Sequence, residues 1–184
     1  MLFEDTEIPG LKIVTPKKHG DARGFFSEVY KQSDWRAAGL KSNFVQDNHS
    51  YSAPVGTLRG LHFQIDPAGQ DKLIRVVRGR ILDVAVDLRR SSPTFGRHAA
   101  IELSAANWRQ LLVPVGFAHG FVTLEPDTAV IYKVTSLYSP AHDRGLAWDD
   151  PDLGIDWRIP AGGPLLSERD TRWPRLRNLT DTFA

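Results

Sequence analysis

Short apolar runs separated by turn residues recur through the middle of the chain. They predict six strands, at residues 73–77, 81–88, 99–103, 110–113, 121–124 and 129–137. Turn signals such as Gly79 and the segment 114–116 separate these runs. Many short strands with frequent turns are typical of an all-β barrel or double sheet. A fold of alternating strands and helices would need helical crossovers between the strands, and the pattern contains none.

The N-terminal part is predicted to add two strands and one short helix. The strands are expected at residues 8–16 and 44–52. The helix is expected from Asp34 to Ala38, with Ser33 as its N-cap and Gly39 as its stop. It is the clearest helical signal in the sequence.

Two further segments lack a plain strand pattern. Residues 21–28 can be interpreted either as a turn followed by a half-buried strand or as an edge that binds an anion and a base. From Tyr138 onward the periodicity fades, which predicts an extended cover of turns and a short helix packed against the barrel. With 184 residues, the chain suits one domain over residues 1–184.

Composition excludes several classes of function. The chain is 41% hydrophobic and 24% charged, as in ordinary soluble proteins, and its net charge of +1 gives no general attraction to nucleic acid or membranes. It contains no cysteine, so disulfides and thiolate chemistry are excluded. No apolar run is long enough to span a bilayer and no leader pattern precedes the first strand, so we expect a cytoplasmic protein.

Polar side chains interrupt the strand pattern between Gly56 and Gly79. Such side chains are costly inside a sheet unless they face a site or solvent. The spacing of Gly56, His62, Gln64, Lys72 and Gly79 resembles the first cupin motif, in which the three polar positions are normally His, His and Glu. The segment 114–119 resembles the second cupin motif. The resemblance implies a cupin-like double-sheet jelly-roll barrel with a few short helices.

The departures from the cupin pattern affect metal binding. Only His62 and His119 remain as good ligands, fewer than the three or four that a catalytic transition metal usually needs, so we expect no metal. Lys72 shares strand parity with Ile74 and Val76, so its cation can stabilise negative charge on a substrate oxygen in the same cavity. Asp83 and Asp87 share the opposite parity from their apolar neighbours in the next strand, and the pattern leaves open which row faces inward.

An imidazole and a cation without a metal favour removal of a proton next to a carbonyl. The enolate that forms carries its charge on an oxygen, where a fixed cation stabilises it. An epimerase also needs a proton donor on the opposite face of the carbon. Tyr132 and Tyr138 share parity on one predicted strand and are the candidates.

Seven segments together resemble the dTDP-4-dehydrorhamnose 3,5-epimerase family over nearly the whole chain. They are DARGFF (21–26), FVQDNHS (44–50), LRGLHFQ (58–64), DVAVDLR (83–89), SPTFG (92–96), PVGFAHGF (114–121) and LSERD (166–170). The resemblance implies a metal-free homodimer without a cofactor, acting on dTDP-4-dehydro-6-deoxy-D-glucose in dTDP-L-rhamnose biosynthesis.

The resemblance also implies a role for individual residues. His62 is implied as the base for the C3 and C5 protons, with Asp170 orienting it, Tyr132 as the donor and Lys72 holding the enolate oxygen. The pairing of His62 with Asp170 rests on the family alone. The implied nucleotide-sugar ligands are Arg23, Phe26, Glu28, Gln46, Asn48, Arg59, His119, Tyr138, Asp143 and Arg169. Phe26 and Tyr138 would sandwich the thymine. Asp143 and Arg169 stand where the family often has Glu and Lys.

Three alternatives remain open from the sequence. The first is an epimerase acting at one carbon only, for a sugar of secondary metabolism, because small changes in substrate pose decide which proton is reached. The second is a sugar-binding cupin without catalysis, because a fold does not fix a function. The third is a metal-dependent cupin.

Overall fold

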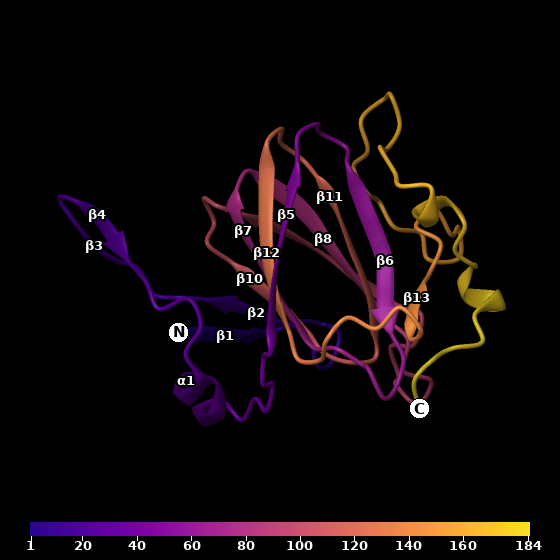
Figure 1. Ribbon diagram of the computed structural model, residues 1–184, viewed down its shortest axis with the longest axis horizontal. Helices are drawn as coiled ribbons and strands as arrows, with labels where there is room; N and C mark the ends of the chain where they lie inside the picture. The colour runs from indigo at the N-terminus through magenta and orange to yellow at the C-terminus, as the bar shows by residue number, and fades with distance from the viewer.

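Two antiparallel sheets face each other and form the body of the molecule (Figure 1). The computed structural model describes all 184 residues. The larger sheet has six strands in the order β1 (Leu2–Asp5), β2 (Lys12–Thr15), β10 (Gln110–Val113), β7 (Lys72–Arg78), β12 (Thr128–Val134) and β5 (Gln46–Ser52). The smaller sheet has five in the order β13 (Asp143–Gly145), β6 (Leu58–Gln64), β11 (Phe117–Thr123), β8 (Arg80–Asp87) and β9 (His98–Ser104). The predicted all-β double sheet is confirmed.

The helix differs from its prediction at its first turn. Helix α1 (Gln32–Ala37) has Lys31 as its N-cap and no side-chain cap bond, so the prediction that Ser33 caps it is wrong. The helix starts before Ser33, which places that side chain inside the first turn. Gly39 follows the helix with a φ of 76°, a conformation that favours glycine and ends the helix as predicted. No helix in the chain has the length and hydropathy needed to cross a membrane.

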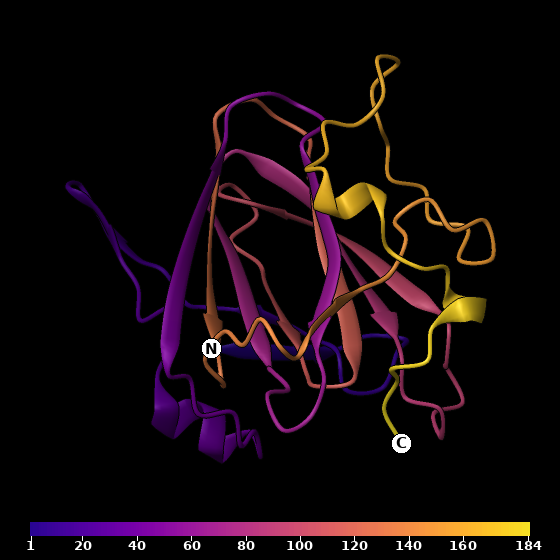
Figure 2. The same cartoon turned by 45° about the vertical axis from the view of Figure 1, so that its right-hand side comes forward.

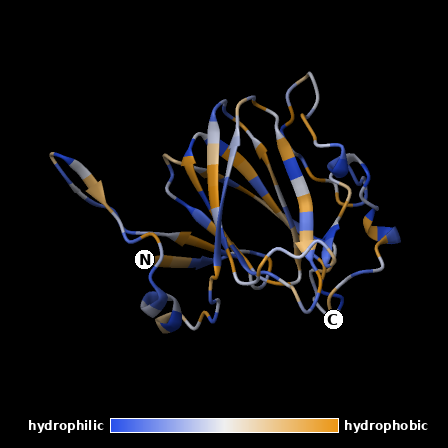
Figure 3. Cartoon of the chain, in the orientation of Figure 1, coloured by the Kyte–Doolittle hydropathy of each residue, from blue (hydrophilic) through white to orange (hydrophobic).

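Alternation along the strands sorts the apolar side chains into separate layers, and Figure 3 shows this alternation in colour. One layer fills the space between the sheets and includes Ile74, Ile81, Ala85, Phe121 and Val130. Its β8 members have the same parity as Asp83 and Asp87, so the acidic row of β8 faces inward. The other row of β8 contributes to a second layer on the outer face of the five-stranded sheet.

The C-terminal segment covers this outer face (Figure 2). It contains two short 3₁₀ helices, η1 (Arg169–Thr171) and η2 (Leu176–Asn178). Leu166, Leu176 and Phe183 pack against the second apolar layer. Single bridges tie Leu165 to Thr57 and Phe183 to Arg89. The predicted extended cover is confirmed, with 3₁₀ turns as its only helices.

A small hairpin projects away from the barrel in both views (Figures 1 and 2). It consists of β3 (His19–Asp21) and β4 (Gly24–Phe26), and every residue of these strands is exposed. The interpretation of this segment as half-buried is therefore wrong. Phe25 packs back toward the body, with its ring 5.0 Å from that of Trp108 in an edge-on arrangement. Phe26 is 69% exposed.

An irregularity at Gly60 decides which side chains of β6 face inward. His62 lies opposite His119, but Arg59 lies opposite Phe121, so three steps along β6 match two along β11. Gly60 occupies the extra position with a φ of 138°. Strict alternation would place residues 59 and 62 on opposite faces, and the extra residue brings both to the same cavity.

We expect Gly60→Ala to destabilise the protein by about 2 kcal/mol or more, because a left-handed φ and a backbone collision act together. A Cβ at this position would lie 2.5 Å from the Cα of Gly120. Urea unfolding measures the change. The matched control is Gly162→Ala, whose added methyl group meets nothing within 4 Å and should change stability by less than about 0.5 kcal/mol. Equal stabilities of the two variants would contradict the expectation.

Candidate active site

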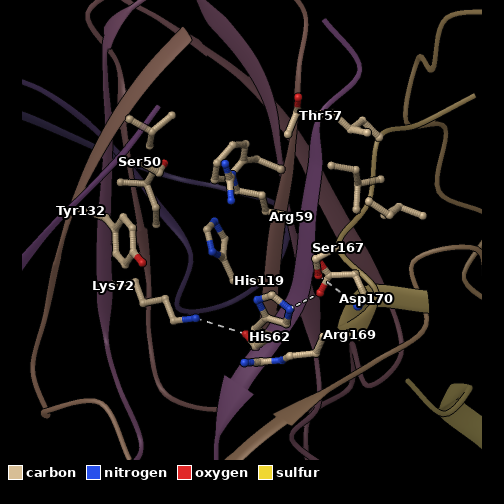
Figure 4. Close-up of a pocket in the computed structure, with 16 residues that line it drawn as sticks. Ser50, Thr57, Arg59, His62, Lys72, His119, Tyr132, Ser167, Arg169 and Asp170 are labelled. Atoms are coloured by element: carbon tan, nitrogen blue, oxygen red, sulfur yellow. Dashed lines mark hydrogen bonds and ion pairs between the residues drawn. The ribbon is translucent and has the colours of Figure 1, made fainter. Parts of the chain in front are cut away.

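A cavity of about 560 Å³ opens between the two sheets, and a smaller one of about 420 Å³ adjoins it. Both cavities are lined by His62, Lys72, Tyr132 and Arg169, so they form one continuous site. Both sheets and the C-terminal cover contribute side chains to it (Figure 4). Its volume suits a ligand of the size of a nucleotide sugar.

His62 and Asp170 form a short polar contact in the site. His62 Nε2 lies 2.5 Å from Asp170 Oδ1, although 108 residues separate them in the sequence. Ser167 Oγ donates to the other carboxylate oxygen at 2.8 Å. Burial raises the pKa of Asp170, but the hydrogen bond and charge of His62 outweigh it, so the pKa lies below its ordinary value. The ionised carboxylate can only accept, which leaves the proton on Nε2 and a lone pair on His62 Nδ1.

Lys72 brings a cation close to His62. It extends from β7 across the cavity, and its Nζ donates to the backbone oxygen of His62 at 3.1 Å (Figure 4). Burial lowers the pKa of Lys72 to about 8, while the negative charges of Asp143 and Asp83 oppose this shift. The ammonium form therefore predominates at pH 7.

Tyr132 faces His62 from the other wall. It belongs to β12 of the six-stranded sheet, whereas His62 belongs to β6 of the five-stranded sheet, and Figure 4 shows the two rings on opposite sides of the cavity. Burial raises the pKa of Tyr132, and the charge of Arg59 opposes the rise. The phenol is protonated at neutral pH and makes no hydrogen bond within the chain, so it is available as a donor.

His119 and Asp83 form a second imidazole–carboxylate pair on the cavity floor. Their Nε2 and Oδ1 atoms are 2.8 Å apart, and Asp83 is fully buried. The other carboxylate oxygen of Asp83 has no hydrogen-bond partner. Burial raises the pKa of Asp83 above its ordinary value, opposed by His119 and Lys72. Lys72 makes no hydrogen bond to this carboxylate and lowers its pKa through its charge alone.

The amide of Gln64, at a cupin ligand position, is fully used by the backbone. Its nitrogen donates to the carbonyl oxygens of Ala68 and Leu137, and its oxygen accepts from Ser139 N at 2.7 Å. No three His, Cys, Asp or Glu side chains converge in a way that could hold a metal ion. That the protein works without a metal stays a prediction.

The structure brings most of the sequence-predicted site residues together. Arg59, His62, Lys72, His119, Tyr132, Arg169 and Asp170 line the larger cavity. Gln46, Asn48, Tyr138 and Asp143 line the adjoining one. Tyr138 Oη donates to Asp143 Oδ2 at 3.1 Å, and Arg169 Nη2 lies 2.5 Å from the same oxygen.

Three predicted ligands lie elsewhere. Arg23 and Phe26 are on the projecting hairpin, and Arg23 pairs only with its neighbour Asp21. Glu28 pairs with Lys31 near helix α1. None of the three lines either cavity of its own chain.

Sequence reasoning missed several residues in or beside the site. Asp83 belongs to a row of alternate β8 side chains, and the sequence pattern did not decide whether this row faces inward or outward. Ser50 lines the cavity with a buried hydroxyl that has no partner, and the strand pattern gave no reason to select it. Ser167 and Trp173 reach the site only because the C-terminal cover folds back over β6, with the Trp173 ring 6.1 Å from that of His62.

The buried carboxylate of Asp83 should make the fold less stable at neutral pH. A raised pKa means that the native state binds the proton more tightly than the unfolded chain does. The contribution of Asp83 to the free energy of unfolding therefore falls as the pH rises above about 4. We therefore expect Asp83→Asn to be more stable than the parent at pH 7, with the difference shrinking toward pH 4. Urea unfolding at both pH values measures it. A less stable variant at pH 7 would refute this, and the exposed Asp149→Asn serves as the control.

Comparison with known proteins places the chain in one family. Residues 5–178 match the family described as dTDP-4-dehydrorhamnose 3,5-epimerase. The dTDP-4-dehydrorhamnose 3,5-epimerase of Sinorhizobium fredii is 50% identical over 183 residues, covering 100% of this chain and 93% of the relative.

Solved structures of similar proteins agree with this match. The epimerase of Bacillus anthracis, crystallised with TDP and PPi bound, is 50% identical with a TM-score of 0.92, covering 95% of this chain and 99% of the other. The 3,5-epimerase of Legionella pneumophila, in complex with dTDP-4-keto-L-rhamnose, is 41% identical with a TM-score of 0.92, covering 97% of this chain and 94% of the other. The chain therefore belongs to the dTDP-4-dehydrorhamnose 3,5-epimerase family.

Proposed function

We propose that this protein epimerises C3 and C5 of dTDP-4-dehydro-6-deoxy-D-glucose to give dTDP-4-dehydro-L-rhamnose, in dTDP-L-rhamnose biosynthesis. Family membership supports the substrate class. The observation that carries the proposal is the placement of His62 and Tyr132 on opposite walls of one cavity. Inverting a carbon centre requires a base on one face and an acid on the other.

The first step assigns His62 as the base. Its Nδ1 lone pair faces the substrate because Nε2 is engaged with Asp170. Removal of the C3 or C5 proton leaves an imidazolium, which the ionised carboxylate of Asp170 stabilises and orients. The C–H electron pair moves into an enolate whose negative charge lies on the C4 oxygen.

Lys72 stabilises that oxygen. Its ammonium is already inside the cavity and has only the backbone oxygen of His62 as a hydrogen-bond partner, so two of its three protons are free for the substrate. A fixed donor aimed at a developing oxyanion contributes about 3–4 kcal/mol to the transition state.

Tyr132 then protonates the carbon from the opposite wall. The phenolate that results lies near Arg59, whose positive charge favours the ionised form of this tyrosine. His62 loses and Tyr132 regains a proton through solvent before the second carbon reacts. The oxidation state of the sugar does not change, so the chemistry calls for no redox cofactor.

The remaining predicted ligands would hold the nucleotide. Arg59 offers a fork of donors suited to the pyrophosphate, and His119 lies beside it on the cavity floor. Gln46, Asn48 and Tyr138 line the adjoining cavity, where the nucleoside would sit.

We expect the protein to exchange both the C3 and C5 hydrogens of the substrate with D₂O, as measured by NMR. Exchange at one carbon only would instead identify a single-site epimerase, and exchange at neither would refute the proposal. His62→Ala should lower exchange by about 10² to 10⁴-fold, because the base is lost. Tyr132→Phe should keep exchange and lose inversion, because deprotonation remains while the opposite donor is missing. Tyr30→Phe, outside the cavity, is the matched control.

We further propose that the protein works as a homodimer in which the hairpin of each subunit completes the cavity of the other. Arg23 and Phe26 are exposed and far from the cavity of their own chain, and a two-stranded hairpin is marginally stable by itself. An arginine and an aromatic ring are the side chains that a phosphate and a thymine require. A second copy would bury them and bring them to the nucleotide.

Mixing two defective subunits tests this arrangement. One carries His62→Ala and the other carries Arg23→Ala with Phe26→Ala, so each homodimer has two defective sites. In a mixed dimer one cavity combines an intact His62 with an intact hairpin, and random pairing should restore about a quarter of the parental activity. If each hairpin serves its own cavity, mixing restores nothing. Co-expression and D₂O exchange provide the measurement.

A further inference from the structure

The indole of Trp173 fills the space that a side chain at position 145 would occupy, and residue 145 is a glycine. Gly145 of β13 lies directly opposite His62 of β6, so a side chain there would be the cross-strand neighbour of the imidazole. A Cβ built on Gly145 would lie 2.2 Å from the indole of Trp173. The indole and imidazole centroids are 6.1 Å apart, with the rings inclined by 70°. The indole therefore supports one side of the His62 ring.

The other contact of the indole leads to the nucleotide side of the site. The guanidinium of Arg169 stacks on Trp173 at 5.1 Å from the ring centroid. Arg169 also pairs with Asp143, which accepts a hydrogen bond from Tyr138. Arg169 lines both cavities, so its position determines the boundary between them.

The backbone fixes where the indole can lie. Trp173 follows Asp170 by three residues and lies two residues after the end of η1. The next residue, Pro174, accepts a hydrogen bond from Ala147 N at 2.8 Å, which ties this turn to the strand segment after Gly145. The indole is thus held between the turn that carries Asp170 and Arg169 and the strand beside His62.

We propose that Trp173 is a positioning residue that links the two halves of the site: it orients the His62–Asp170 pair and, through Arg169 and Asp143, the residues that hold the nucleobase. This rests on the proposed function. The indole lines neither cavity, so its effect is transmitted by the residues it supports.

The first expectation concerns Trp173→Ala. Its kcat for C3 and C5 exchange should fall by about 10²-fold, because a displacement of roughly 1 Å at the base has that effect. Its Kd for dTDP, measured by calorimetry, should rise several-fold, because Arg169 loses its stacking surface. Trp173→Phe keeps an aromatic ring and should recover most of both losses. Arg172→Ala, an exposed side chain on the same turn, should match the parent in both measurements.

Gly145→Ala separates positioning from general damage. Gly145 has an ordinary φ, so only the added methyl group matters, and that group collides with the indole. We expect Gly145→Ala to reproduce the losses of Trp173→Ala. Adding it to Trp173→Ala should cause no further loss, because the colliding ring is gone. Circular dichroism and thermal melting identify variants that fail to fold.

The outcomes are distinct. Trp173→Ala with kcat and Kd both within twofold of the parent would overturn the proposal, as would a change in only one of them. Additive losses from Gly145→Ala and Trp173→Ala would also overturn it. A parent protein that exchanges neither carbon would refute the proposed function instead, and the dTDP affinities of the two variants would still test the link to the nucleotide side.

Discussion

Burying charged side chains between two apolar sheets is the constraint on which the site depends. Lys72, Asp83, His119 and Asp170 all leave bulk water, and an unpaired charge there would cost several kcal/mol. The structure offsets this cost by pairing each imidazole with a carboxylate and by placing the single ammonium near two acidic groups. Part of this cost remains, because one oxygen of Asp83 has no hydrogen-bond partner and burial lowers the pKa of Lys72. Groups held in this state are well suited to proton transfer.

The family resemblance identified the residues, but the backbone explains why they meet. His62 and His119 are neighbours because their strands pair, and Lys72 and Tyr132 face them because β7 and β12 pair in the opposite sheet. Asp170 arrives by a different route, on the segment that covers the outer face of the barrel. In the proposed mechanism, the base comes from one sheet, the acid from the other, and the group that orients the base from the cover.

Local patterns in the sequence were enough to predict where the strands lie. They were not enough to predict contacts between residues far apart in the sequence. Apolar alternation located the strands, since it reflects burial between and outside the sheets. Parity placed Lys72 inward, but it could not place Arg59, because the extra residue at Gly60 reverses the alternation. Pattern alone could not pair residues 62 and 170, which are brought together only by tertiary packing. The hairpin was misjudged because nothing in so short a segment indicates that it projects from the body of the molecule.

The segment that carries Asp170 is anchored at both ends. Leu165 exchanges hydrogen bonds with Gly56 and Leu58 at one end, and Phe183 does so with Leu88 and Arg90 at the other. A loop with free ends would have to be immobilised each time a substrate arrived, and that loss of conformational entropy would weaken binding. Here the chain is immobilised once, during folding. The free energy of substrate binding can therefore contribute to affinity and to the orientation of the sugar, because the protein around the sugar is already ordered.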